Sequence, residues 1–561
     1  MSARDYLIEI RTEALAPKAL ATLSKAFSGE ILAGLKRLEL NHGPAESFAT
    51  PRRLALKIDS VDEAQSDKQI ERFGPAVKAC FDGDGNPTQA ALGFAKSCGV
   101  EFDALGRAEK DGVEKLFYQA SQPGKQTATL LSALVTDALD KLPIPKRMRW
   151  GNSRAEFVRP VHWVVQLFGD EVIDGEFFGA RAGRETRGHR FHTSAPLTVS
   201  APADYAQLLE NEGHVIPQFD RRREMIRELV IEEGKKQNAT SVIDEALLTE
   251  VTSLVELPVA LTGKFEEHYL EVPAEALILA MKSHQKTFYC VDKDGKLLPL
   301  FIAVSNIRSK DPAQVIEGNE RVIRPRLADA SFFFETDKQV SLESHLEALK
   351  KIVFQDKLGT VYDRSVRIAK LSKALATNCN ADPALCERAA MLSKCDLMTN
   401  MVGEFADLQG LMGRYYALHD GEAPEVAEAI DDQYRPRFAG DELPSGNTGA
   451  VLAIAEKLDT LCGLFAIGQP PTGSKDPFAL RRAAIGLLRI MIEKQLDLDL
   501  SDCIDKAFAG LDSLDPSLVD RSVEVKQQAL EFLLDRLQAW SSDRGISPGV
   551  FQSVMALRPT R

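Results

Sequence analysis

A change in hydrophobic pattern near residue 340 constrains the fold of this 561-residue chain most strongly. Before it, short runs such as Tyr6, Ile8 and Ile10 alternate apolar and polar residues, as half-buried strands do, and helical patterns separate them. After it, apolar residues recur at helical spacing. The chain is also too long for one core. We therefore predict a multidomain α+β protein, with N-terminal mixed α/β units followed by an all-α region and C-terminal helices.

The first 60 residues predict a strand, a helix and a second strand. Pro17 is placed to begin the helix, whose apolar positions are Leu20, Leu23, Phe27, Ile31, Leu35 and Leu38. Beyond residue 340, the ranges 341–376, 382–401, 424–432 and 449–465 have helical patterns. Asp476 and Pro477 supply a cap and a first-turn proline for a further helix.

Net charge argues against a non-specific polyanion binder, because 82 acidic residues outnumber 69 Lys and Arg and give −13. Local basic patches could still recognise RNA. No apolar run is long enough for a signal peptide or a membrane span. The eight cysteines form no CxxC pair, which predicts reduced thiols in a cytoplasmic protein without membrane contact.

Nucleotide and metal motifs are missing from the sequence. GxxxxGK[ST], GxGxxG and HExxH do not occur, and neither do the signature peptides of class I or the motifs of class II aminoacyl-tRNA synthetases. We therefore assign no catalytic residue, no metal ligand and no cofactor to this chain.

Candidate RNA contacts are basic residues near aromatic residues or glycine, because unpaired bases stack on rings while phosphates pair with cations. Gly188, between Arg187 and His189, would let a backbone approach closely. For each cluster alone, a solvated surface or an intersubunit salt bridge explains the residues at least as well. The candidates are Arg52, Arg53, Lys146, Arg147, Arg149, Arg187, His189, Arg190, Lys282, Lys286, Arg321, Arg324, Arg326, Lys475, Arg481 and Arg482.

The stretch 318–338, GNERVIRPRLADASFFFETDK, places three of these arginines around Pro325. Because a residue before proline disfavours the helical conformation, we predict that Arg324 and Arg326 do not share one regular helical turn. Guanidiniums at such a point suit phosphate, but ion pairs with nearby acids are favoured on the residues alone. Those acids are Glu317, Glu320 and Asp329. Further on, Leu327, Ala330 and Phe334 fall at helical spacing.

This stretch resembles the signature of the bacterial glycyl-tRNA synthetase beta-subunit family. Four further stretches are similar to that family: SFATPRRLALKI (47–58), KLPIPKRMRWG (141–151), LSKCDLMTNMVGEFADLQGLMGRYYALHDGE (392–422) and FAIGQPPTGSKDPFALRRAA (465–484). The similarity covers essentially the whole chain. After the first strand the family reads Gly-Thr-Glu-Glu-Leu-Pro, whereas this chain has Arg11, Ala14 and Ala16 at the differing positions. If position 11 requires a positive φ, Arg11 is strained.

The resemblance implies the beta subunit of a heterotetrameric (alpha2beta2) glycine–tRNA ligase. Such a subunit binds and positions tRNA(Gly), while the alpha subunit uses ATP and Mg to attach glycine. It implies that 1–340 form an α+β body that contacts tRNA or partner. Residues 341–510 resemble an HD domain with a degenerate metal motif, since Ser393 and Lys394 stand where the His-Asp pair belongs. Residues 511–561 are expected to lead towards an anticodon-binding domain that this chain lacks.

Two alternatives stay open. A relative of HD-type phosphohydrolases or of nucleotidyltransferases would bind a divalent metal and hydrolyse its substrate without a partner. His419-Asp420 invites this interpretation, but its context, LHDGE, favours a helix end, where a cation is stabilised by the dipole. A pure assembly scaffold would use its arginines for folding or for the alpha subunit and would not contact RNA.

Overall fold

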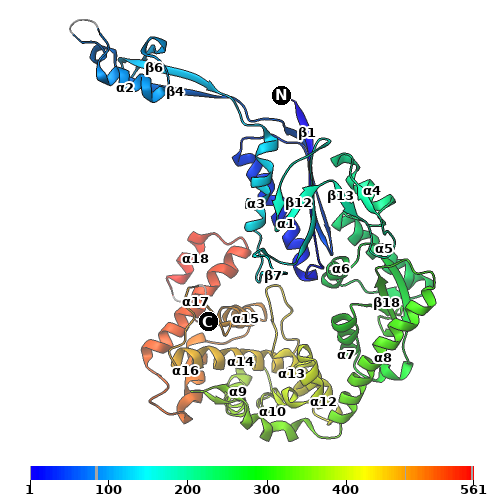
Figure 1. Cartoon of the computed structure of the whole chain (residues 1–561). Coiled ribbons are helices and arrows are strands. Elements are labelled where there is room, and N and C mark those ends of the chain that lie inside the picture. Colours follow the sequence, from blue (N-terminus) through cyan, green and yellow to red (C-terminus); the bar gives the residue numbers. More distant parts are fainter. Residues whose placement is uncertain (1, 83–85, 474, 558–559, 561) are drawn as a thin grey trace. The chain divides into compact units, whose positions relative to one another are not determined.

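The computed structural model describes residues 2–82, 86–473, 475–557 and 560. The chain forms two compact units. The sheet unit comprises the residues up to Lys264 together with 286–319, and the helical unit comprises 265–285 and the residues from Glu320 onwards. The first unit mixes strands and helices and the second is dominated by helices (Figure 1). The predicted α+β class is confirmed; the predicted domain boundaries at 340 and 510 stay predictions.

A seven-stranded sheet forms the centre of the sheet unit. Its strand order is β11-β12-β9-β1-β3-β2, with β10 beside β9. Pairing is antiparallel except between β12 and β9. The strands are β1 (Ala3–Thr12), β2 (Ala45–Thr50), β3 (Arg53–Asp62), β9 (Val161–Phe168), β10 (Glu171–Val172), β11 (Glu176–Phe177) and β12 (Ala180–Gly183).

Strand β1 is buried on both faces. Successive side chains of a strand point to opposite sides, so the two faces of β1 pack against different elements. Tyr6 and Ile8 pack with α1 (Pro17–Arg37) and α3 (Leu131–Asp140). Leu7 packs on the other face, with Tyr205 of α4 (Tyr205–Asn211). Helix α1 begins at Pro17, so the predicted strand, helix and strand of the first 60 residues are confirmed.

The remainder of the sheet unit consists of smaller assemblies. A three-stranded sheet of β4 (Lys68–Ala76), β5 (Gly106–Lys110) and β6 (Val113–Gln122) shares a small core with α2 (Gln89–Cys98). A four-stranded sheet packs on α5 (Phe219–Lys236) and α6 (Glu245–Thr252), with strands β15 (Thr240–Ser241), β16 (Val259–Lys264), β17 (Phe288–Val291) and β18 (Leu297–Ser305). Two short pairs join β7 (Met148–Arg149) to β8 (Glu156–Phe157) and β13 (Glu185–Arg187) to β14 (Pro196–Thr198).

Helix α14 (Asn447–Ala466) is the central element of the helical unit and is buried on nearly every side (Figure 1). Such a helix is apolar all round, because its neighbours cover each face. Those neighbours are α9 (Val361–Ala376), α10 (Pro383–Leu392), α13 (Pro424–Asp432), α15 (Leu480–Glu493), α16 (Leu500–Ala509) and α17 (Val523–Asp543). The unit also contains α7 (Ala274–Leu279), α11 (Asn400–Glu404), α12 (Leu411–His419) and α18 (Pro548–Met555).

Four predictions about local structure are wrong. The predicted helix over 382–401 ends at Leu392, and α11 begins only at Asn400. Helix α15 begins at Leu480, so Pro477 is not in its first turn, although the Asp476 carboxylate does accept from Leu480 N.

The other two concern Pro325 and the range 341–376. Helix α8 (Pro312–Asp337) runs through Pro325, so Arg324 and Arg326 do lie in one helix. Proline removes one helical hydrogen bond, and the buried side chains of Leu327 and Phe334 hold the following turns in place. The predicted helix over 341–376 is interrupted: a 3₁₀ segment, Leu342–Lys351, and two short strands precede α9. A turn at Gly359, whose φ is 85°, breaks the helix there.

None of the described helices is long and apolar enough to cross a lipid bilayer. All eight cysteines lie in the described part of the chain and carry free thiols. Seven of them are buried, which explains their scattered positions as small apolar side chains of the separate cores.

Candidate nucleic-acid interface

Segments far apart in the sequence bring basic residues together at one end of the main sheet. Arg11 near the end of β1 pairs in register with Arg53 of β3 and with Trp163 of β9. A cavity of about 310 Å³ lies here. Its lining includes Arg11, Glu13, Arg52, His162, Trp163, Arg187, Gly188 and Arg190.

A second cavity of about 410 Å³ shares Arg52 and Arg190 with the first. It adds Arg159 and the 189–191 segment, with Glu256 as its acidic residue. We call the two cavities together the basic cleft. Both are lined by residues of the sheet unit alone.

A buried network of charges supports the cleft. Arg53 and Glu9 are both 0 % exposed, and Arg53 Nη1 lies 3.2 Å from Glu9 Oε2. Glu9 also accepts hydrogen bonds from Trp163 Nε1 at 3.1 Å and from the hydroxyls of Thr186 and Tyr205. Arg53 Nη2 donates to the carbonyl oxygen of Arg187 at 2.9 Å, which fixes the loop that carries the basic residues. The network therefore connects β1, β3, β9 and β13.

Arg11 is a buried cation that lines the first cavity. Its side chain is 5 % exposed, and its Nε and Nη1 have no hydrogen-bond acceptor among the described residues. The guanidinium lies 5.3 Å from the Trp163 ring and 4.0 Å from Glu256 Oε1. Burial, followed by the neighbouring charge of Arg53, lowers the pKa of Arg11 to about 10. Unsatisfied N–H groups that line a cavity favour an anionic oxygen there.

Glu256 is the counter-charge at the base of the cleft. Burial alone would raise the pKa of this carboxyl, but the charges of Arg53 and Arg11 outweigh burial and lower it. Thr50 Oγ1 also donates to Glu256 Oε1 at 2.8 Å. Glu256 therefore stays ionised and pairs with the buried cations Arg11 and Arg53. It does not neutralise the exposed arginines of the cleft.

The 187–190 loop depends on a glycine, as the sequence predicts. A Cβ on Gly188 would lie 2.4 Å from the carbonyl oxygen of Gly213, so no larger residue fits without movement. His189 N donates to the same oxygen at 2.6 Å. His189 is 1 % exposed and therefore cannot present much surface to a ligand, whereas Arg187 and Arg190 on either side are exposed.

Aromatic surface accompanies the cations. The Arg187 guanidinium lies 5.6 Å from the centre of the Trp163 ring, and Arg11 contacts the same ring. Phe191 at the second cavity is 71 % exposed. Glu13 is held near His162, at 2.9 Å, and this hydrogen bond is the main cause of its lowered pKa. Cations beside accessible rings are the combination that single-stranded RNA requires.

The structure distributes the predicted residues unevenly. The cleft contains Arg52, Arg187, His189 and Arg190. Arg53 is too deeply buried to contact a ligand, which corrects its predicted role: it supports the loop instead. Sequence analysis missed Arg11, Arg159 and Trp163 as cleft residues. Arg11 is extended and not strained, and its position in register with Arg53 explains the convergence.

Other predicted clusters lie elsewhere. Lys146, Arg147 and Arg149 are at or near β7; Arg147 Nη2 donates to the Asp140 carbonyl oxygen at 2.9 Å, and Arg149 pairs with Glu156. Lys282 belongs to the helical unit, whereas Lys286 belongs to the sheet unit and pairs with Glu250 at 2.9 Å. These residues do not form one site.

The remaining candidates belong to the helical unit. Arg321, Arg324 and Arg326 are exposed on α8, and Arg324 Nε pairs with Glu266 Oε1 at 2.6 Å rather than with the predicted acids. Lys475 is exposed before α15. Arg481 Nη2 donates to the Gly473 carbonyl oxygen at 2.7 Å. Arg482 lines a different cavity, which lies within the helical unit.

The residues that the structure describes contain no group of three or more His, Cys, Asp or Glu placed to hold a metal ion. Lys394, which the sequence analysis aligns with the His-Asp pair of an HD domain, is 4 % exposed. His419 ends α12, as its context predicts, and Asp420 Oδ2 accepts from Leu342 N at 2.6 Å.

Comparisons with known proteins identify the class and then the family. Relatives about half identical to this chain are aminoacyl-tRNA synthetase subunits named glycine–tRNA ligase beta subunit. The relative from Marinobacter nauticus is 52% identical over the whole of this chain and 80% of its own length; that from Hahella chejuensis is 50% identical, and that from Tolumonas auensis 51%. The model of the family described as glycyl-tRNA synthetase beta subunit matches residues 6–556. The chain belongs to this family.

Proposed function

We propose that this chain binds tRNA(Gly) and docks on an alpha subunit in an alpha2beta2 glycine–tRNA ligase of the cytoplasm. Its relatives are named glycine–tRNA ligase beta subunit. This name supports the reaction, and the words beta subunit imply a second kind of subunit. In this proposal the alpha subunit uses ATP and Mg to activate glycine. This chain contributes position, because holding tRNA near the activated amino acid makes the transfer effectively unimolecular.

The basic cleft carries the proposal. It concentrates Arg11, Arg52, Arg159, Arg187 and Arg190 on a protein whose net charge is −13. The acids nearest to it are already engaged: Glu256 faces Arg53 and Arg11, and Glu13 faces His162. Phosphates are therefore the expected partners of the exposed arginines.

The rings of Trp163 and Phe191 favour RNA over a simple phosphate surface. Phe191 is largely exposed, and Trp163 is held in place by a hydrogen bond to Glu9. Unpaired bases at an RNA end or loop can stack on such rings while adjacent phosphates pair with arginine.

Charge reversal tests the cleft directly. Arg187→Glu should weaken binding of tRNA(Gly) by about tenfold or more, because one attraction is lost and one repulsion is added. Arg181→Glu is the matched control: its side chain is 79 % exposed, it is on β12 of the same unit, and it lines neither cavity. Fluorescence anisotropy with labelled tRNA, on wild type and both variants, measures the difference.

Charging with purified alpha subunit gives the functional comparison. Glycylation should be stimulated by this chain and much less by the Arg187→Glu variant. If both variants bind tRNA as tightly as wild type while Arg187→Glu weakens affinity for the alpha subunit, the chain is an assembly scaffold and the proposal is wrong. Release of phosphate from nucleotides by this chain alone, dependent on added divalent metal, would instead favour the phosphohydrolase alternative.

A further inference from the structure

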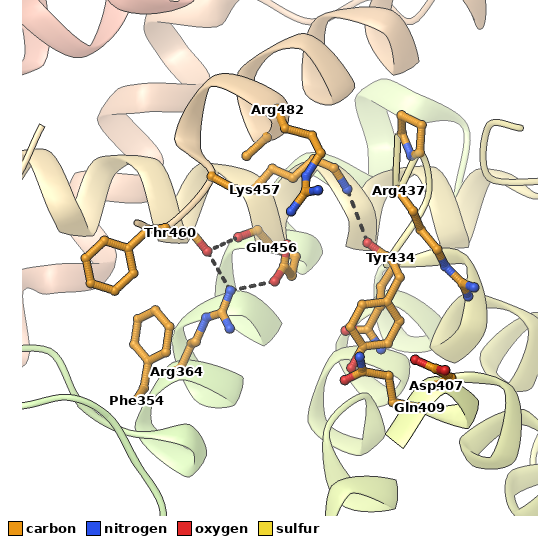
Figure 2. Close-up of a pocket in the computed structure, with 15 residues that line it drawn as sticks. Phe354, Arg364, Asp407, Gln409, Tyr434, Arg437, Glu456, Lys457, Thr460 and Arg482 are labelled. Atoms are coloured by element: carbon orange, nitrogen blue, oxygen red, sulfur yellow. Dashed lines mark hydrogen bonds and ion pairs between the residues drawn. The ribbon is translucent and has the colours of Figure 1, made fainter. Parts of the chain in front are cut away.

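The helical unit contains a cavity of about 520 Å³ around α14 (Figure 2). Arg364 reaches it from α9, Lys457 from α14 and Arg482 from α15, while Tyr434 and Arg437 follow α13 (Figure 2). Its lining contains four cations, since Arg437 is added to Arg364, Lys457 and Arg482. Its acids are Asp407 and Glu456.

One buried cation at this cavity, Lys457, forms no ion pair with a carboxylate in the described part of the chain. Glu456 Oε1 accepts a hydrogen bond from Arg364 Nη2 at 2.6 Å and lies 3.8 Å from Lys394 Nζ. Lys457, the next residue, is 6 % exposed and donates to the carbonyl oxygens of Gln433 and Arg435. Arg364 also pairs with Asp459 at 3.6 Å, whereas Lys457 has no carboxylate within 4.0 Å among the described residues. Burying a cation without an ion-pair partner is costly.

Polar atoms at the cavity are left without partners. Gln433 is 0 % exposed, and its Nε2 donates to the carbonyl oxygens of Ser393 and Ile430. Its Oε1 and the hydroxyl of Tyr434 have no hydrogen-bond partner among the described residues. Both residues line the cavity. Buried acceptors and hydroxyls of this kind are normally satisfied, so they indicate a missing polar ligand.

Arg482 and three rings complete the lining. Arg482 is exposed, and no carboxylate in the described part of the chain forms an ion pair with it. Phe354, Tyr434 and Phe478 line the same cavity, and Phe478 is 40 % exposed. The cavity therefore combines cations for a phosphate with rings and amides for a planar polar group.

We propose that this cavity binds a nucleoside phosphate, with the phosphate against Lys457 and Arg482 and the base edge towards Gln433 and Tyr434. The cavity volume lies within the range typical of small-molecule sites. An anion here would pair with Lys457 and Arg482, which have no carboxylate partner among the described residues. The proposal goes beyond the proposed function, because the site is in the helical unit and does not use the basic cleft.

Two sources can present this chemistry: a free nucleotide, or the terminal nucleotide of an RNA strand. Titration calorimetry on the full chain, with AMP and UMP as free nucleotides and a 5′-phosphorylated trinucleotide as the strand end, distinguishes them. Binding of a mononucleotide at least as tight as that of the trinucleotide assigns a free nucleotide. Binding of the trinucleotide alone assigns a strand end. Adenosine and inorganic phosphate are the partial ligands.

Arg482→Ala is the informative variant, because its exposed side chain can be removed without disturbing the core. It should weaken binding of the nucleotide about tenfold, the effect of one lost charge-assisted contact. Lys370→Ala is the charge-matched control, an exposed cation on α9 that does not line the cavity. It should leave affinity unchanged.

Several outcomes would overturn the proposal. Absence of binding by both mononucleotides and the trinucleotide at millimolar concentration is one. Equal affinity for adenosine and AMP would remove the role of the phosphate, and equal affinity for inorganic phosphate and AMP would remove the role of the base. Unchanged affinity in Arg482→Ala would place the ligand elsewhere. None of these results depends on the Arg187→Glu experiment, so failure of either proposal is separately visible.

Discussion

The basic cleft of the sheet unit and the cavity of the helical unit both rest on buried cations, but they balance charge differently. In the cleft, Arg53 divides its donors between Glu9, Glu256 and a carbonyl oxygen. In the cavity, Arg364 reaches two carboxylates, Glu456 and Asp459, whereas Lys457 donates to carbonyl oxygens. A planar guanidinium can satisfy several acceptors at once, whereas an ammonium concentrates its charge at one point.

The consequence appears in the lysine pKa values. Burial lowers the pKa of Lys394 and of Lys457 to about 8, although the charge of Glu456 partly opposes this. The cleft also buries a cation with a lowered pKa, Arg11 at about 10, but Glu256 lies 4.0 Å from it, and Arg187 and Arg190 are exposed. The cavity instead buries Lys457 with no carboxylate within 4.0 Å among the described residues, so pH or a bound anion can change its contribution.

Glu9→Gln should give the largest effect, because it leaves Arg53 with less negative charge in a fully buried position. We expect a loss of about 3 kcal/mol in the free energy of unfolding, the usual cost of breaking one side of a buried ion pair. Urea denaturation measures it. Glu171→Gln, whose side chain is 65 % exposed in a pair with Arg4, should cost less than about 1 kcal/mol. Equal losses in the two variants would show that the network is not what holds the cleft.

Gly188→Ala should come next. Its Cβ would meet the backbone of Gly213, which cannot rotate away as a flexible side chain can. We expect about 1 to 3 kcal/mol of destabilisation, as for an overpacked core position. Gly183→Ala, on β12 with nothing within 4 Å of its Cβ, is the control and should be nearly neutral. A neutral Gly188→Ala variant would mean that the loop moves freely, which contradicts a preformed cleft.

Lys457→Met tests the unmatched charge through pH. The unfolded chain keeps the ordinary pKa of 10.5, whereas the folded pKa is about 8, so the unfolded state binds more protons between these values and stability rises with pH. The free energy of unfolding of wild type relative to Lys457→Met should therefore rise by about 1 to 2 kcal/mol between pH 8 and pH 10.

Lys350→Met is the control for this pH experiment. Lys350 is exposed, and its hydrogen bond with Glu347 raises its pKa, so its contribution should not grow over the same range. If the difference in free energy of unfolding between wild type and Lys457→Met does not change between pH 8 and pH 10, Lys457 is not a buried cation without a partner. The comparison with the cleft would then lose its basis.

Arg190→Ala should have the smallest effect on free energy, because one exposed arginine is removed without reversal of charge. Affinity for tRNA should fall about threefold to tenfold at moderate salt. The slope of log affinity against log salt concentration should become less steep by about 1, the contribution of one phosphate contact. Arg181→Ala should leave the slope unchanged. An identical slope for wild type and Arg190→Ala would show that Arg190 does not contact a phosphate.

Local pattern accounts for much of what could be predicted. The alternation in β1, the proline at the start of α1 and the close approach at Gly188 each depend on residues near one another or on a single steric rule. The predicted break at Pro325 was wrong because the packing of Leu327 and Phe334 outweighs one missing hydrogen bond. Of the cleft, Arg52, Arg187 and Arg190 were predicted, whereas Arg11 and Trp163 were not.

The sequence by itself determined the family, the change from mixed to helical structure and the pool of arginines that could meet RNA. Tertiary structure decided which of those arginines act together. Strand register places Arg11 between Arg53 and Trp163. Because Arg53 is fully buried, it supports the loop at Arg187 and does not contact a ligand. In the helical unit, packing brings Lys394 within 3.8 Å of Glu456. Pairing and desolvation depend on distances between segments far apart in the chain, and no local pattern specifies those distances.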